Sequence, residues 1–127
     1  MPPNPEDDLR SFELRANAQL QRTLQLSAEL EAAEVMVQSP NGEVTVRVNS
    51  AGGLADLVFH PESDRLVRDD LARLVLTTSR RAQAKLAERV SEITTSMYGA
   101  SSSTAAFLSE AYTSRYPQPD DDDPETR

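Results

Sequence analysis

Residues 39–61, SPNGEVTVRVNSAGGLADLVFHP, decide the fold of this chain. Two runs of alternating apolar and polar residues, 43–49 and 54–59, each follow a glycine-containing turn. Alternation with a period of two is typical of antiparallel strands that bury one face. Asn-Gly and Gly-Gly supply the positive φ angles that tight turns between such strands require. With the short β-prone stretch at residues 34–38, the segment predicts a three-stranded antiparallel meander.

The apolar positions of this segment are candidate core residues. Val44, Val46 and Val48 fall on one face of the second strand, and Leu57 and Phe59 on one face of the third together with Ala55. Three strands form a stable sheet only when another element covers the apolar face. The residues on either side of the meander must therefore supply a helix to cover it.

A long helix is predicted before the sheet, over residues 9–33, which contain no glycine or proline. Its apolar residues form a narrow stripe with steps of three or four: Leu9, Phe12, Ala16, Leu20, Leu24, Ser27 and Leu30. A small sheet would bury such a stripe poorly. We therefore expect the stripe, Leu20 and Leu24 included, to pack against a second copy of the chain.

A second long helix is predicted after the sheet, from about Arg68 to the Tyr98-Gly99 stop. Its apolar positions also step by three or four, over more than seven turns. Residues 99–127 read as a flexible acidic extension with a short helix over residues 105–116, and residues 1–8 read as disordered. The domain is therefore expected to span residues 9–98, with an α+β fold.

Composition excludes several classes of function. The 127 residues contain no cysteine, so disulfides and thiolate metal sites are excluded, and no stretch is apolar enough for a membrane span. No secretory signal is evident, so the cytoplasm is the expected location. The net charge is −8, but residues 1–8 carry −3 and residues 117–127 carry −4. The body between them is nearly neutral.

Catalytic chemistry is not indicated. The single histidine, His60, precedes a proline at a strand end and has no candidate nucleophile or second metal ligand near it in sequence. The acidic pairs Asp69/Asp70 and Glu88/Glu92 are typical of helix-dipole and solubility charges. We therefore expect no enzyme activity, no cofactor and no metal.

Basic residues are better organised than acidic ones within the helices. Arg81, Lys85 and Arg89 are spaced by four residues on the second helix, and Arg73 and Arg80 lie nearby. Arg15 and Arg22 lie on the first helix. A basic stripe of this kind suits the phosphate backbone of DNA, which gives salt-dependent binding with little sequence preference. The alternative is an ordinary solvated surface, interrupted by Glu88 and Glu92.

The order of these pieces resembles the YbaB/EbfC family of bacterial nucleoid-associated proteins, in its actinobacterial branch. The resemblance rests on residues 39–46 (SPNGEVTV), on Gly53-Leu54 leading to Leu57, Phe59 and Pro61, and on the helix from Leu71; it covers residues 9–97. It implies a homodimer without catalytic or cofactor chemistry. It also implies binding to DNA with low sequence specificity, a place in the nucleoid and a role in gene regulation.

A second hypothesis stays open. The same fold occurs in actinobacterial proteins associated with ESX (type VII) secretion, which implies a protein-interaction adaptor. Tyr116 and Asp120 match the Tyr-x-x-x-Asp/Glu pattern of such secretion signals, although two prolines stand between them. Under the DNA-binding hypothesis, the acidic tail is instead a candidate competitor of DNA phosphates for basic side chains.

Overall fold

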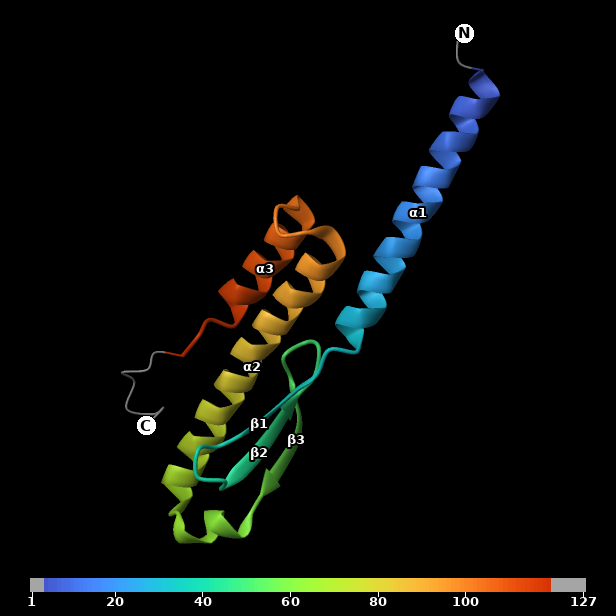
Figure 1. Cartoon of the computed structure of the whole chain (residues 1–127). Helices are drawn as coiled ribbons and strands as arrows, with labels where there is room; N and C mark the ends of the chain where they lie inside the picture. Colours follow the sequence, from blue (N-terminus) through green and yellow to red (C-terminus); the bar gives the residue numbers. More distant parts are fainter. Residues whose placement is uncertain (1–3, 120–127) are drawn as a thin grey trace.

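The computed structural model describes residues 4–119 and has an α+β fold (Figure 1). Its elements follow the predicted order of a long helix, a three-stranded antiparallel sheet and C-terminal helices. They are α1 (Pro5–Glu31), β1 (Val35–Gln38), β2 (Val44–Val48), β3 (Leu54–Phe59), the short 3-10 helix η1 (Pro61–Arg65), α2 (Arg68–Tyr98) and α3 (Ser103–Arg115). The predicted fold class is confirmed.

Helix α1 begins inside the range that was predicted to be disordered. The side chain of Asn4 accepts a hydrogen bond from the backbone N–H of Glu6 at 3.1 Å, and Pro5 takes the first helical position. The next residues, Glu6, Asp7 and Asp8, place negative charge at the positive end of the helix dipole. A cap, a proline and an acidic first turn together start the helix at Pro5, before the expected domain boundary at residue 9.

The strands form one sheet in the order β1-β2-β3 with both pairs antiparallel. Gly42 and Gly52 take the positive φ angles, 76° and 82°, that the two connecting turns require. Val46 lies opposite Val37 on one side and Leu57 on the other. An irregularity beside Val48 places Leu54, not Ala55, opposite that residue.

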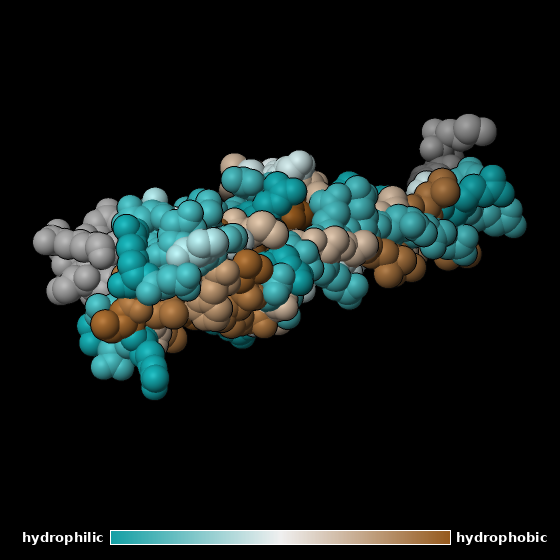
Figure 2. Space-filling view, turned by 90° about the horizontal axis from the view of Figure 1, so that it is seen from below, coloured by the Kyte–Doolittle hydropathy of each residue, from teal (hydrophilic) through white to brown (hydrophobic). Residues whose placement is uncertain are grey.

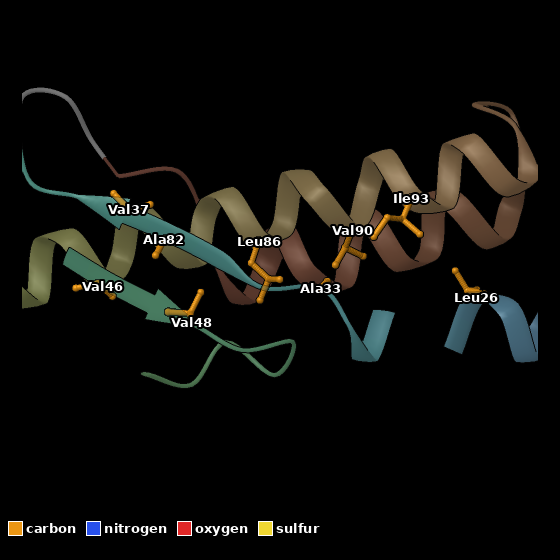
Figure 3. Packing of buried hydrophobic residues seen from close by; sticks show 9 residues of the cluster. All are labelled: Leu26, Ala33, Val37, Val46, Val48, Ala82, Leu86, Val90 and Ile93. Atoms are coloured by element: carbon orange, nitrogen blue, oxygen red, sulfur yellow. The ribbon is translucent and has the colours of Figure 1, made fainter. Parts of the chain in front are cut away.

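Helix α2 covers the sheet over β1 and β2, and this contact holds the core (Figure 3). Val44, Val46 and Val48 are fully buried, as are Ala82 and Leu86 of α2. Farther along α2, Val90 and Ile93 extend the same cluster toward Leu26 of α1 and toward Ala33, which follows α1. The core is therefore a single layer of valine, leucine and alanine side chains between one sheet face and one helix.

Strand β3 lies beyond the reach of α2, although its side chains share the apolar face. Phe59 is opposite Val44 and Leu54 is opposite Val48, so their side chains belong to the face that α2 covers elsewhere. Yet Phe59 is 52% exposed and Leu54 is 51% exposed, whereas Leu57 is half-buried. Phe59 was expected in the core or in a dimer interface; within one chain it is not a core residue.

Helix α1 extends away from the body over most of its length (Figure 1). Leu26 is its only buried residue, and Leu30 packs beside it at the edge of the core. The rest of the predicted stripe stays exposed, with Leu20 at 54% and Leu24 at 55%. Figure 2 shows brown, hydrophobic residues on one side of the body and at intervals along this arm.

Beyond α2, the chain forms α3 close to the short helix that was expected over residues 105–116, and the described residues continue to Pro119. Gly99 ends α2 at a φ of 89°, as the sequence indicated, and the side chain of Ser102 caps the next helix. Helix α3 then runs back along α2, where Ser109 accepts a hydrogen bond from Ser91 at 2.8 Å. Small residues on α2, including Ala84 and Ala87, let the two helices approach closely.

Candidate nucleic-acid interface

The basic residues of α2 that are candidates for DNA binding differ in their exposure and in their ion pairs. Arg73 and Arg89 are well exposed and each pairs with an acidic residue three positions away, Asp70 or Glu92, at 3.5 Å. Exposed pairs of this kind contribute little stability, so neither arginine is fixed against rearrangement. Arg80 and Lys85 are also exposed, and Arg81 is half-buried.

Arg80, Arg81 and Lys85 gather around the residues that follow α3. We call residues 116–119 the strap. A hollow of about 320 Å³ is lined by Arg81, Lys85 and Pro119, and β1 forms its far wall. A second hollow, of about 310 Å³, is lined by Arg80, Arg115 and Pro119. The strap therefore borders Arg80 in one hollow and Arg81 with Lys85 in the other.

Two residues of the strap are held by hydrogen bonds. The hydroxyl of Tyr116 donates to the backbone carbonyl of Ala51 at 2.6 Å, in the turn between β2 and β3. The side-chain amide of Gln118 donates to Oε1 of Glu88 at 2.6 Å. Tyr116 thus attaches the start of the strap to the turn before β3. Gln118, two residues later, lies in the hollow that β1 borders.

The position of the Tyr116 ring against the β2–β3 turn depends on Gly52. A Cβ at Gly52 would collide with the Tyr116 ring and hydroxyl, so only glycine leaves room for that ring. Gln83 of α2 steadies the same turn by donating to the Gly52 carbonyl at 2.8 Å. Tyr112 adds a second contact, because its hydroxyl donates to the Ser50 carbonyl at 3.4 Å.

The strap was not recognised as part of a site from the sequence. The available signal was a pair of tyrosines, Tyr112 and Tyr116, spaced by one helical turn immediately before Pro117. Such a pair indicates a packed helix end. Nothing in the sequence pointed to its partner, because the β2–β3 turn lies more than 60 residues away in the chain.

The arginines of α1 lie apart from this cluster. Arg22 places its guanidinium 5.7 Å from the centre of the Tyr98 ring, near the C-terminal end of α2. Arg15 is exposed farther along the arm. The structure therefore brings Arg80, Arg81 and Lys85 together at the strap, while Arg73, Arg89, Arg22 and Arg15 remain separate along the molecule.

His60, the single histidine, has a structural partner in the sheet. His60 shares a hydrogen bond of 2.7 Å with the Thr45 hydroxyl across β2 and β3. Within residues 4–119, no three acidic or histidine side chains come together in a way that would hold a metal ion. In that same range, no helix has the combination of length and apolar character needed to cross a membrane.

Comparison with known proteins agrees with this arrangement. The model of the YbaB/EbfC DNA-binding family matches residues 8–101, which include most of α1, the sheet and α2. Helix α3 and the strap lie beyond the matched range. A comparison with curated proteins finds no match. Because the family model covers well over half of the chain, the protein belongs to the YbaB/EbfC DNA-binding family.

Proposed function

We propose that this protein binds duplex DNA through phosphate contacts, as a homodimer in the bacterial nucleoid, and that it influences gene expression there. The observation that carries the proposal is the cluster of Arg80, Arg81 and Lys85 on one helix, with Lys85 one turn beyond Arg81. Cations about 6 Å apart along a helix suit a row of phosphates, whose spacing on one strand is similar.

Phosphate contact accounts for this surface better than base reading does. Base reading needs side chains on an element that enters a groove, with amide or guanidinium groups aimed at base edges. Here the helix is flanked by the strap on one side and by β1 on the other. Cations on such a surface meet the backbone first, so we expect affinity without sequence preference.

A salt titration tests the proposal. Fluorescence anisotropy with two duplexes of equal length, one rich in A·T and one in G·C, is expected to give equal affinities that fall with salt. The variant Arg81→Glu/Lys85→Glu should bind more weakly. It should also lower the slope of log affinity against log salt by about 2, because two phosphate contacts are lost.

The matched control is Arg68→Glu, which reverses a charge on the first turn of the same helix but outside the cluster. Its affinity and salt slope should stay close to those of the unaltered chain. Absence of binding at low salt by every form of the protein, or equal losses in both variants, would reject the proposal.

A protein-interaction adaptor is the second candidate, and the exposed apolar residues of α1 and β3 favour it. These residues suit a protein surface and have no use in phosphate contact. Recovery of a stable protein partner from cell extract, together with no nucleic acid and no DNA binding in the titration, would select the adaptor over the DNA-binding protein.

A further inference from the structure

The basic residues of this chain are almost all arginines. Lysine and arginine together number 13, and Lys85 is the only lysine among them. A lysine ammonium can lose a proton and react with an acyl group, whereas an arginine guanidinium keeps its protons and does not. Chemistry directed at side-chain amines therefore has a single target here, and that target lies in the basic cluster on α2.

The side chain of Lys85 is accessible to a reagent. It is exposed, and within residues 4–119 it makes no hydrogen bond and no ion pair. Its ammonium is thus unlike the guanidinium of Arg89, which lies 3.5 Å from the carboxylate of Glu92. An amine without a paired carboxylate reacts without first breaking an ion pair.

The hollow beside Lys85 suits a small anion. It has a volume of about 320 Å³, and its charged lining residues are Arg81, Lys85 and Glu88. Two cations and one carboxylate leave an excess of one positive charge among the described residues. An acyl phosphate carries its reactive carbonyl next to a doubly negative phosphate group. The positive charge of the hollow therefore draws that carbonyl toward the Lys85 amine.

We propose that Lys85 is a modification site at which a small acyl phosphate acylates the side-chain amine, and that this acylation weakens DNA binding. The ammonium first gives a proton to water. The neutral nitrogen then attacks the carbonyl carbon, so that a C–N bond forms and the C–O bond to phosphate breaks. The phosphate leaves with the electron pair and takes up the proton that the nitrogen loses. The product is a neutral amide, so the cluster loses one positive charge.

The effect on DNA binding rests on the function proposed above. Acylation removes one phosphate contact, so the slope of log affinity against log salt should fall by about 1. In about 0.1 M salt, this loss corresponds to an affinity that is lower by about five- to tenfold. The arginines of the cluster keep their charge, so binding should weaken and not vanish.

Mass spectrometry of the full chain tests the modification, with the α-amine of the chain as an internal reference. An α-amine normally reacts faster near neutral pH, because this class of amine holds its proton less tightly than lysine does. Acetyl phosphate is compared with acetylimidazole, an uncharged acetyl donor. The ratio of acetylation at Lys85 to acetylation at the α-amine should be at least about threefold higher with acetyl phosphate. Equal ratios with the two donors would overturn the proposal.

A variant must show that the hollow attracts the donor, because the acidic first turn of α1 also repels anions from the nearby α-amine. Arg81→Gln should lower the ratio with acetyl phosphate and leave the ratio with acetylimidazole unchanged. The matched control, Arg68→Gln, lies about 25 Å from Lys85 along the helix and should leave both ratios unchanged. The acidic residues from Asp120 onward, which lie outside the described residues, are the same in both variants. An equal fall in both would mean that only net charge matters, and would overturn the proposal.

Acetyl-coenzyme A tests the other common class of acyl donor, the thioesters. At equal concentration and without any enzyme, acetyl phosphate should acetylate Lys85 faster, because its phosphate adjoins the reactive carbonyl. Faster acetylation of Lys85 by the thioester would overturn the assignment of the donor as an acyl phosphate.

Fluorescence anisotropy tests the effect on DNA. After treatment with acetyl phosphate, the unaltered chain should bind duplex DNA more weakly than before, with the lower salt slope given above. Lys85→Arg keeps the charge but lacks the amine, so its own affinity should be the same before and after treatment. Equal weakening of both chains by the treatment would place the effect at the α-amine and would overturn the regulatory part of the proposal.

The two measurements separate the possible failures. Acetylation of Lys85 with no DNA binding by any form of the protein would keep the modification site, but would reject its effect on DNA together with the proposed function. Acetylation of Lys85 with unchanged DNA affinity would reject the regulatory effect and leave the proposed function standing.

Discussion

Glu43 shows how a single buried charge organises the turn between β1 and β2. Its side chain is 5% exposed, accepts a hydrogen bond from the Ser39 hydroxyl at 2.9 Å and lies 3.8 Å from the Arg65 guanidinium. Burial opposes its charge, but hydrogen bonds from its own amide and Ser39, with the positive charge of Arg65, outweigh burial. The pKa of Glu43 therefore lies below its ordinary value of 4.5.

This shift predicts acid sensitivity. A carboxylate with a lowered pKa in the folded state stabilises that state above its unfolded pKa, and the contribution disappears as the pH falls through the folded value. The stability advantage of the unaltered chain over Glu43→Gln, measured by urea unfolding, should thus be present at neutral pH and shrink below about pH 4.5. A stability difference between the unaltered chain and Glu43→Gln that stays constant with pH would contradict the prediction.

At the scale of elements, the attachment of α3 to the sheet depends on Gly52. Gly52→Ala and Gly99→Ala both place a side chain on a backbone with positive φ, but only the first meets Tyr116, since no atom lies near the second. We expect Gly99→Ala to cost about 1 kcal/mol in unfolding free energy. Gly52→Ala should cost about 1–3 kcal/mol more because of the collision.

Urea unfolding of both variants checks this, and a Tyr116→Ala background supplies the control. Once the tyrosine ring is absent, the extra cost of Gly52→Ala should largely disappear. If both glycine substitutions lowered the unfolding free energy equally in the unaltered background, the contact between Tyr116 and Gly52 would not be needed to attach α3.

The helices and strands were largely predictable from the sequence, but the contacts between them were not. Alternation at Val44, Val46 and Val48 identified a strand face, and the period of α2 placed that helix within a residue of its start. The same alternation predicted the sheet face on which Phe59 lies but not whether a helix buries it. The period of a strand does not indicate how far a helix extends across the sheet. For the candidate site, the sequence located the basic residues on α2; the strap went unseen because its contacts join distant parts of the chain.

At the scale of the whole molecule, the uncovered apolar residues support the proposed dimer. Leu54 and Phe59 continue the buried sheet face beyond α2, and Val67 and Leu76 are exposed near the start of that helix. Exposed residues of this size gain roughly 1.5–3 kcal/mol each on full burial, which favours a second copy over water. A two-fold contact would use the same residues from each chain.

The dimer prediction is tested by light scattering during gel filtration. The unaltered chain should elute with twice the mass of one chain, and Leu54→Lys/Phe59→Lys should shift the protein toward a single chain, because two charges would be buried in the interface. Phe107→Lys, at an exposed residue of α3 outside the family range, should leave the mass unchanged. If Leu54→Lys/Phe59→Lys kept the double mass, the interface would lie elsewhere.

Because most of α1 projects from the body, a small rotation at its C-terminal end produces a large displacement of its N-terminal end. Helix α1 has 27 residues and is therefore about 40 Å long, yet its core contacts lie near its C-terminal end, at Leu26 and Leu30. The tip lies about 32 Å from Leu26, so a rotation of about 6° there would move it by roughly 3.3 Å, which is close to the rise of one base pair. The packing of Leu26, Leu30 and Ala33 at the core, with Arg22 over the Tyr98 ring, therefore limits how far the tip can move.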